Sequence, residues 1–434
     1  MPTPPPSSAS PGRARQDAVY RAGVLGRRPV VPAGPDELAE RARRVMSPEA
    51  WAYVAGGAGA ERTVAANRAA FDRWSIVPRM GRDVSSRDLS VELLGRRLPA
   101  PVLVAPVGAA GLVARDADVL IGGGAADVGL PYVISTQGSS PMEETAAAMG
   151  DAPRWYQLYW STDDALVDSF VRRAEGIGAD AVVVTLDTTL LGWRPRDLDL
   201  GSLPFARGIG IAQFTSDPRF LEVVRDVVQE KGGAGRGGAE VTLGALRSLL
   251  SIARETPGAT LDNLRSPYPR AAVETFLRIY SKPSLTWDDI ATLPGRTRLP
   301  VLVKGVLHPD DARLALEAGV AGIVVSNHGG RQVDGAIASL DALPDVAAAV
   351  GGRVPVLLDG GVRTGADVAK ALALGADAIL LGRPHVYGLA LEGRAGVRTV
   401  LENLVAELDL TLGLSGLTSV CELRERGAEV LRRV

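Results

Sequence analysis

Short apolar runs rich in β-branched residues recur along most of this chain, and amphipathic stretches separate them. The runs are 102–105, 132–135, 155–159, 181–186, 301–304, 322–326, 354–359 and 378–381. Between most of them the apolar positions repeat at helical spacing, as in 310–319, where Asp310 stands at the start and Gly319 at the end. Strands that are apolar throughout and alternate with helices predict a parallel sheet buried on both faces.

Eight such units predict an α/β protein with the (β/α)8 architecture of a TIM barrel. An open, doubly wound sheet is the alternative that the pattern alone leaves. Helical spacing from 35 to about 71 predicts an N-terminal helical cap, and short alternating runs over 73–98 predict short strands that add to it. Residues 1–35 abound in Pro and Ser and show no period, so we expect a disordered arm there, with the barrel domain over 36–434.

The series of strands and helices is interrupted once, by a long insertion after the fourth strand. It contains a Gly-rich stretch, 231–238, which is expected to be flexible, and then a helical pattern. Loops that follow barrel strands lie around the active site, so residues 200–285 are expected to form a lid-like insertion. A surface insertion without regular structure is the alternative.

The composition excludes several classes of function. Lysine and arginine total 48 against 50 acidic residues, a formal net charge of −2, which leaves no basic footprint for nucleic acid. No metal-ligand spacing occurs, and the single cysteine, Cys421, is expected to be a buried, inert thiol. Because no apolar run approaches the length of a bilayer span and Met1 to Arg15 lacks a signal sequence, we expect a cytoplasmic protein without membrane or nucleic-acid partners.

Two glycine–arginine sites follow the last two predicted strands. Gly360 and Gly361 precede Arg363, and Gly382 precedes Arg383. The loops after strands seven and eight commonly hold phosphate in such barrels, where backbone N–H groups, arginines and a helix N-terminus meet the anion. We expect a phosphate cradle, with ordinary turn glycines and surface arginines as the alternative.

The sixth predicted strand ends in His328, one of three histidines, followed by Arg331. An imidazole titrates near neutrality and suits a proton acceptor. Arg331 and Arg194 can each bind a carboxylate through two hydrogen bonds, and Asp187 ends the fourth strand. These residues predict proton abstraction from a small anionic substrate, with an organic electron acceptor because no metal site is indicated.

The runs 326–332 (Ser-Asn-His-Gly-Gly-Arg-Gln), 359–363 (Asp-Gly-Gly-Val-Arg) and 382–384 (Gly-Arg-Pro) resemble those of the FMN-dependent 2-hydroxy-acid dehydrogenases and oxidases. The resemblance extends over roughly residues 36–425. Within that family, 45–79 and 193–198 look most similar to the lactate 2-monooxygenases. The resemblance implies FMN as cofactor and oxidation of a small L-2-hydroxy acid to the 2-oxo acid or its decarboxylated product, with O2 as electron acceptor. It also implies a homo-oligomer, typically a homotetramer.

The resemblance also implies a role for individual residues. His328 would be the catalytic base, paired with Asp187. Arg194 and Arg331 would hold the substrate carboxylate, and Tyr53 and Tyr159 would hydrogen-bond the carboxylate and the hydroxyl. The residues implied for FMN are Ala105, Gly108, Ser135, Gln157, Thr185, Lys304, Asp359, Gly361, Arg363, Gly382 and Arg383.

Two positions depart from the pattern of the family. Gln137 stands where glycolate oxidases tend to carry a bulky aromatic and lactate 2-monooxygenase an apolar residue, and Gly108 stands where many oxidases have Ala. A polar amide that faces the pocket should favour a polar substrate side group or an ordered water. The alternatives to a small-acid oxidase are a flavin-dependent tailoring oxidase for a larger or carrier-bound substrate and a flavin isomerase without net redox chemistry.

Overall fold

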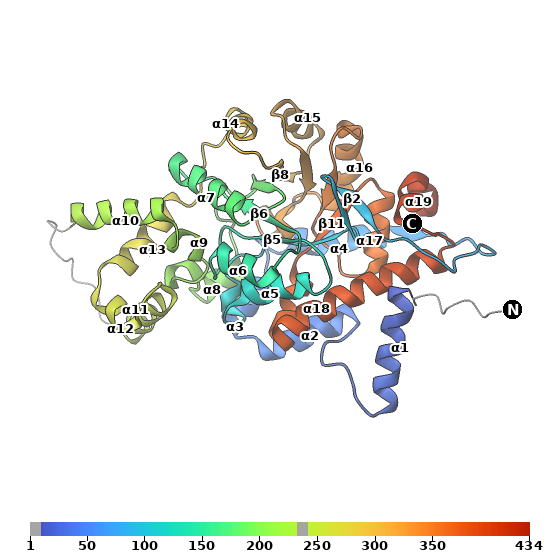
Figure 1. Ribbon diagram of the computed structural model, residues 1–434, viewed down its shortest axis with the longest axis horizontal. Coiled ribbons are helices and arrows are strands. Elements are labelled where there is room, and N and C mark those ends of the chain that lie inside the picture. Colours follow the sequence, from blue (N-terminus) through green and yellow to red (C-terminus); the bar gives the residue numbers. More distant parts are fainter. Residues whose placement is uncertain (1–9, 232–241) are drawn as a thin grey trace.

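The computed structural model describes residues 10–231 and 242–434, and its centre is a closed barrel of eight parallel strands (Figure 1). The prediction of a (β/α)8 barrel is confirmed, and the open sheet is excluded because β4 pairs with β11. In the order β10-β11-β4-β5-β6-β7-β8-β9, the strands are β4 (Val102–Val104), β5 (Tyr132–Ile134), β6 (Arg154–Leu158), β7 (Val182–Thr185), β8 (Val301–Val306), β9 (Gly322–Val325), β10 (Val356–Leu358) and β11 (Ala378–Leu381).

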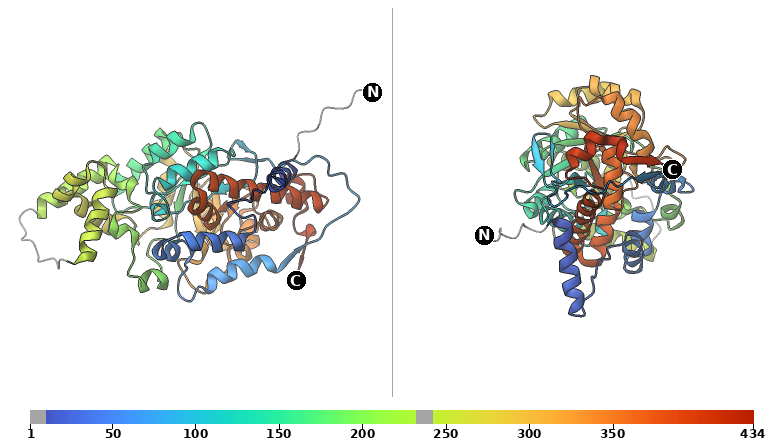
Figure 2. Two further views of the ribbon diagram at one scale, coloured as in Figure 1. Left: turned by 90° about the horizontal axis from the view of Figure 1, so that it is seen from below. Right: turned by 90° about the vertical axis from the view of Figure 1, so that its right-hand side faces the viewer.

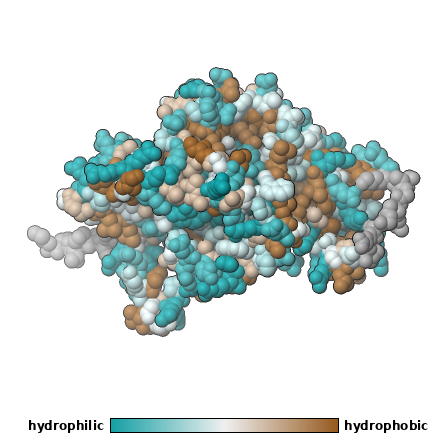
Figure 3. Space-filling model, turned by 180° about the vertical axis from the view of Figure 1, so that it is seen from behind, coloured by the Kyte–Doolittle hydropathy of each residue, from teal (hydrophilic) through white to brown (hydrophobic). Residues whose placement is uncertain are grey.

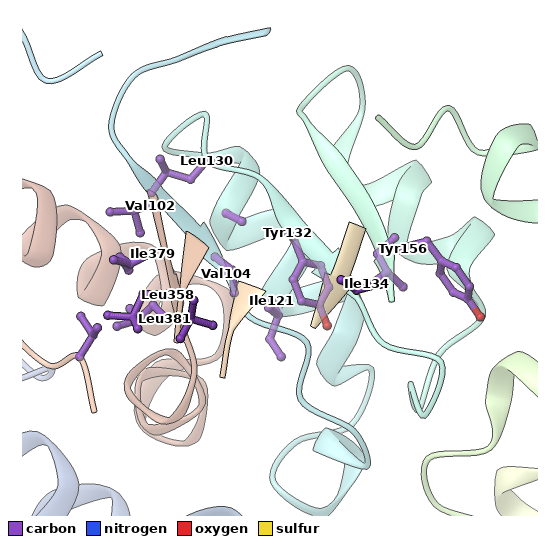
Figure 4. Close-up of a cluster of buried hydrophobic side chains, with 14 of the residues drawn as sticks. Val102, Val104, Ile121, Leu130, Tyr132, Ile134, Tyr156, Leu358, Ile379 and Leu381 are labelled. Atoms are coloured by element: carbon purple, nitrogen blue, oxygen red, sulfur yellow. The ribbon is translucent and has the colours of Figure 1, made fainter. Parts of the chain in front are cut away.

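Helices that follow these strands surround the barrel. They include α5 (Ala117–Ala126), α6 (Met142–Met149), α7 (Asp164–Gly176), α15 (Pro309–Glu317), α16 (Ser339–Val350), α17 (Gly365–Ala373) and α18 (Arg383–Leu414). Successive residues of a strand face alternately the surrounding helices and the barrel interior. Because both sides are buried, every strand position must be apolar. One set, which includes Val102, Val104 and Ile134, packs outward with Ile121 of α5 (Figure 4). The other set, which includes Leu103 and Val133, fills the barrel interior.

A hairpin of β2 (Val91–Leu93) and β3 (Arg96–Leu98) closes one end of the barrel. Val91, Leu93 and Leu98 belong to the same buried cluster as the inward-facing strand residues. Because β3 leads directly into β4, the hairpin covers the N-terminal ends of the strands. The opposite end, where the strands finish, is therefore the one left for chemistry.

The N-terminal segment differs from the prediction. The helical cap is present as α2 (Pro35–Val45), α3 (Pro48–Ala55) and α4 (Arg62–Asp72), but the expectation of disorder over 1–35 is wrong for residues 11–24, which form a helix. There, α1 (Pro11–Val24) packs against α18 and projects from the body (Figure 1). Its first turn is tied down because the Gly12 amide donates to buried Asp409, 3.0 Å away, which also pairs with Arg87. Residues 1–9 lie outside the described residues.

The insertion between β7 and β8 is helical and lies at the end of the molecule opposite the termini (Figures 1 and 2). Its helices are α8 (Pro195–Asp199), α9 (Ala212–Thr215), α10 (Pro218–Lys231), α11 (Leu243–Glu255), α12 (Thr260–Arg265), α13 (Tyr268–Ile279) and α14 (Trp287–Thr292). Phe214 packs edge-on against Phe220, Phe276 and Phe170 of α7, which joins the insertion to the barrel. The expected flexible stretch 231–238 falls almost wholly outside the described residues, and a lid function stays a prediction.

Hydrophobic and hydrophilic residues are intermixed over the face seen in Figure 3, with the hydrophobic ones in irregular groups. Among the described residues, no helix has the length and apolar character needed to cross a membrane. Cys421 is exposed, so the expectation of a buried thiol is wrong. It lies on α19 (Val420–Arg426), whose inward face is formed by Val420 and Leu423, and the cysteine falls on the outward face.

Candidate active site

A cavity of about 1020 Å³, including the part open to solvent, lies at the C-terminal end of the barrel strands. Most residues singled out in the sequence line it, although they come from all parts of the chain. These are Tyr53, Ala105, Gly108, Tyr159, Arg194, Lys304, His328, Arg331, Asp359, Gly361, Arg363, Gly382 and Arg383. Leu191, Phe205 and Tyr280 of the insertion add to its wall. The cavity is therefore shared by the barrel, the N-terminal cap and the insertion.

His328 and Asp187 are in direct contact. The Nδ1 atom of His328 lies 2.8 Å from Oδ1 of Asp187 and 3.1 Å from the hydroxyl of Thr188. His328 follows β9 with a φ of 56°, a left-handed conformation that a non-glycine residue rarely adopts. Its amide donates to Ser326 Oγ, 3.0 Å away, which helps to hold this turn. The backbone thus directs the imidazole toward Asp187 at one side and the cavity at the other.

The charges around this pair determine its protonation. Burial raises the pKa of Asp187, but His328 and Lys304 more than offset that effect and bring it down to about 2. Burial lowers the pKa of His328, and Asp187 opposes that effect in part. Asp187 is therefore an acceptor only, so the shared proton lies on Nδ1 of His328. At neutral pH this leaves Nε2 as a free base.

Two arginines lie near each other beside Tyr53. Arg331 donates to the backbone carbonyls of Tyr53 and Gly56, and its guanidinium stacks over the Tyr53 ring at 4.8 Å from the ring centre. Arg194 donates to the carbonyl of Arg331 at 3.2 Å and to Gln332 Oε1 at 2.9 Å. Burial and the charge of Arg194 lower the pKa of Arg331 to about 9. An anion placed between the guanidinium groups would relieve this repulsion, so the pair fits a carboxylate.

Lys304 is a buried cation, 3% exposed, that also lines the cavity. Its ammonium donates to Ser326 Oγ at 2.7 Å and lies 3.1 Å from Asp359 Oδ2 and 3.9 Å from Asp187 Oδ2. Burial lowers the pKa of Lys304, but Asp359 and Asp187 outweigh it and raise the pKa overall, so the amine stays charged. Asp359 Oδ1 is buried without a hydrogen-bond partner among the described residues, which marks it as an acceptor for a ligand hydroxyl.

The glycine–arginine sites after β10 and β11 face the same cavity. Gly361 has a φ of 95°, and a Cβ there would lie 2.3 Å from the carbonyl oxygen of Asn67, so only glycine fits. Among the described residues, the guanidinium of Arg363 donates only to the carbonyl of Val362, at 2.8 Å. Arg383 by contrast donates to three carbonyls, those of Val54, Gly56 and Gly329. Arg363 thus has donors left for a phosphate, whereas Arg383 also holds α3 against the turn after β9.

Ser135, Gln157, Thr185 and Asp187 do not line the cavity. Asp187 lies behind His328, and the other three form a buried chain in which Ser135 donates to Gln157 and Gln157 donates to Thr185, both at 3.0 Å. The Gln157 amide thereby has a fixed orientation. Tyr159 does line the cavity, and burial, with a contribution from the charge of Asp187, raises its pKa to about 12, so its hydroxyl remains protonated.

Sequence reasoning missed residues that hold this site in place. Gln332 accepts from Arg194 and donates to the carbonyls of Asp187 and Leu190 at 2.7 and 2.9 Å, so it connects the arginine to the base pair. Asn67 and Asn327 exchange two amide hydrogen bonds of 2.8 Å across the interface of cap and barrel. Gln332 belonged to the recognised run 326–332, which could have singled it out, but nothing near Asn67 in the sequence indicates its partner.

The donors fit the expected FMN. The guanidinium of Arg363, which has N–H groups left over, and the glycine at 361 suit a phosphate. The unpaired oxygen of Asp359 suits a ribityl hydroxyl, and the buried ammonium of Lys304 suits an electron-rich ring edge. Among the described residues, no group of three or more His, Cys, Asp or Glu side chains could hold a metal ion.

Comparison with known proteins agrees with this geometry. The family described as FMN-dependent dehydrogenase matches residues 42–430. An FMN-dependent alpha-hydroxy acid dehydrogenase of Penicillium citrinum is 41% identical over 96% of this chain and 95% of its own length. An L-lactate oxidase of Lysinibacillus sphaericus is 40% identical over 86% of each chain. The crystal structure of mandelate oxidase with (S)-4-hydroxymandelic acid superposes with a TM-score of 0.74 at 35% identity, over 92% of this chain and 98% of that one. The chain therefore belongs to the FMN-dependent dehydrogenases that act on 2-hydroxy acids.

Proposed function

We propose that this chain oxidises a small L-2-hydroxy acid to the corresponding 2-oxo acid and that O2 is the final electron acceptor. The observation that carries the proposal is the contact of His328 with Asp187 in the same cavity as Arg194 and Arg331. A base that shares a cavity with two carboxylate-binding arginines suits a substrate whose reacting carbon is bonded to a carboxylate. The relatives named L-lactate oxidase support O2 as acceptor.

In the proposed mechanism, Arg194 and Arg331 bind the substrate carboxylate, and the hydroxyls of Tyr53 and Tyr159 orient the carboxylate and the substrate hydroxyl. His328 accepts one substrate proton at Nε2, and Asp187 stabilises the imidazolium that forms. FMN, when bound, supplies the two-electron acceptor. Lys304 stays cationic through its contacts with Asp359 and Asp187, so it can stabilise negative charge on that acceptor.

The FMN would be held by the residues that the resemblance assigns. Arg363, Arg383, Gly361 and Gly382 would bind the phosphate, and Asp359 the ribityl chain. Ala105, Gly108 and Lys304, which line the cavity, would lie beside the ring. The resemblance also assigns Ser135, Gln157 and Thr185 to the ring, although in this structure they form a buried chain outside the cavity lining. A homotetramer and a cytoplasmic location stay predictions.

Anaerobic titration of the FMN-loaded protein with a panel of L-2-hydroxy acids tests the proposal. At least one of them should bleach the visible flavin absorbance, and His328→Ala should slow this reduction by at least ~10²-fold. A variant that reduces at nearly the wild-type rate would refute the role of His328. Failure of every acid to bleach the flavin would refute the reaction itself and favour an isomerase.

The products formed in air distinguish two outcomes after oxidation. An oxidase releases the 2-oxo acid and hydrogen peroxide in equal amounts. A lactate 2-monooxygenase-like enzyme retains the 2-oxo acid and yields the decarboxylated carboxylic acid and CO2. We propose the oxidase outcome, because the similar proteins include L-lactate oxidases and a 4-hydroxymandelate oxidase. Recovery of the shortened acid as the main product would contradict this.

A further inference from the structure

Gln137 brings an unpaired amide to the wall of the cavity. The residue is only 6% exposed, yet it lines the pocket that also contains His328 and Tyr159. Its backbone N–H and carbonyl are both bonded, to Ser135 Oγ at 3.1 Å and from the Ala109 amide at 2.8 Å. No hydrogen bond joins its side-chain amide to any described residue. Its amide atoms are not among the fully buried unpaired atoms of the described residues, so they are accessible from the cavity and offer a donor and an acceptor to a ligand.

Gly108 is the residue that makes room for Gln137. A Cβ at position 108 would lie 2.8 Å from the Cβ of Gln137 and 3.0 Å from its Oε1, closer than real Cβ contacts. An alanine at 108 would therefore displace the amide. The two departures from the family pattern are thus one structural feature, in which a small residue permits a larger polar neighbour.

The loop that carries Gln137 is held firmly from outside the cavity. Buried Asp118 of α5 accepts the amides of Ser139 at 2.7 Å and Ser140 at 3.2 Å. Gln213 of α9 donates to the Ser140 carbonyl at 3.0 Å, which ties the loop to the insertion as well. A side chain on such a supported loop keeps a defined position, as a recognition group requires.

The charges of the cavity determine which ligand groups suit the amide. Among the described residues, five arginine and lysine side chains line the cavity: Arg194, Lys304, Arg331, Arg363 and Arg383. Their positive charges are balanced by Asp187 and Asp359, by an FMN phosphate of about two negative charges and by one substrate carboxylate. No cation is then left for a second carboxylate, so a neutral hydrogen-bonding group fits best beside Gln137.

We propose that Gln137 recognises a neutral polar group, such as a hydroxyl, on the side chain of the 2-hydroxy acid, and that Gly108 is required for this recognition. The inference rests on the proposed function and adds the class of its substrate. A site built to hydrogen-bond a substrate hydroxyl discriminates against the analogue that lacks it, because the buried amide is then left unpaired.

Matched pairs of acids test the proposal on the FMN-loaded enzyme. The pairs are glycerate with 2-hydroxybutanoate, and (S)-4-hydroxymandelate with (S)-mandelate, each differing by one polar group. The wild-type kcat/KM should favour the hydroxylated member of at least one pair by about tenfold or more. Gln137→Leu and Gly108→Ala should each reduce that ratio to near one. Gln229→Leu, the same exchange at an exposed position of α10, should leave it unchanged.

Binding supplies a readout that does not depend on turnover. Calorimetry with the unreactive acids 3-hydroxypropanoate and butanoate should show the same preference in the wild type and its loss in Gln137→Leu. Three results would each overturn the inference. The wild-type enzyme could show no preference within either pair, or Gln137→Leu could leave the ratio of kcat/KM values unchanged. The third is a higher kcat/KM for malate, which carries a second carboxylate, than for any acid of the two pairs. In all three cases 2-hydroxy acids would still bleach the flavin, whereas failure of the proposed function would abolish bleaching altogether.

Discussion

Replacing Asp187 by Asn tests the electrostatic link between this part-buried carboxylate and His328, the proposed base. The substitution keeps the size of the side chain and removes its charge, 2.8 Å from Nδ1 of His328. In the wild type, burial lowers the pKa of His328 and Asp187 opposes this effect. Without the carboxylate the pKa of His328 falls further, and the imidazolium formed on proton uptake loses its partner. Flavin reduction should therefore slow.

The size of the effect follows from the distance. Two unit charges 2.8 Å apart attract by about 6 kcal/mol at an effective dielectric constant of about 20. With half of the positive charge developed on the ring in the transition state, the loss is about 3 kcal/mol, or about 10²-fold in rate. Lys304 keeps its charge because Asp359 remains 3.1 Å away, so the change acts mainly through His328.

Stopped-flow reduction under anaerobic conditions, followed over a range of pH, measures both consequences. The limiting rate should fall about 10²-fold, and the limb that rises with pH should move to lower pH because a weaker base loses its proton earlier. Thr188→Val is the matched control, since it removes a neutral hydroxyl 3.1 Å from the same ring nitrogen and should cost much less. A reduction rate within about threefold of the wild type, with an unmoved profile, would refute the reasoning.

Three further predictions concern binding and stability. Arg363→Ala should weaken FMN binding with little change in the Tm of the apoprotein. Arg383→Ala should lower both the FMN affinity and the Tm, because Arg383 also donates to three backbone carbonyls. Equal effects of the two variants on the Tm of the apoprotein would contradict this. Arg194→Lys and Arg331→Lys should each raise KM for the acid about 10- to 100-fold in steady-state assays, since lysine cannot replace a bidentate guanidinium. Gly12→Val should release α1 from α18, seen as faster amide exchange over Pro11–Val24, because a Cβ at Gly12 would lie 2.6 Å from Leu410 Cγ; unchanged exchange would count against that packing.

The sequence alone determined the barrel and most of the cavity. Strands buried on both faces need apolar residues throughout, and that pattern located all eight of them. In a parallel barrel the ends of the strands meet at one mouth, so residues that follow them, such as His328 and Lys304, could be expected together without knowledge of any contact.

Only the tertiary structure decided features that depend on partners distant in the chain. Helix α1 shows little periodicity, and its order depends on Asp409, which lies 397 residues from Gly12. The pairing of Asn67 with Asn327 and the unpaired amide of Gln137 arise in the same way. The burial that lowers the pKa of His328 is likewise a property of the packed molecule, and so are the nearby charges of His328 and Lys304 that lower the pKa of Asp187. Local periodicity specifies the elements of this protein, whereas hydrogen bonding and desolvation depend on which elements the folded chain brings together.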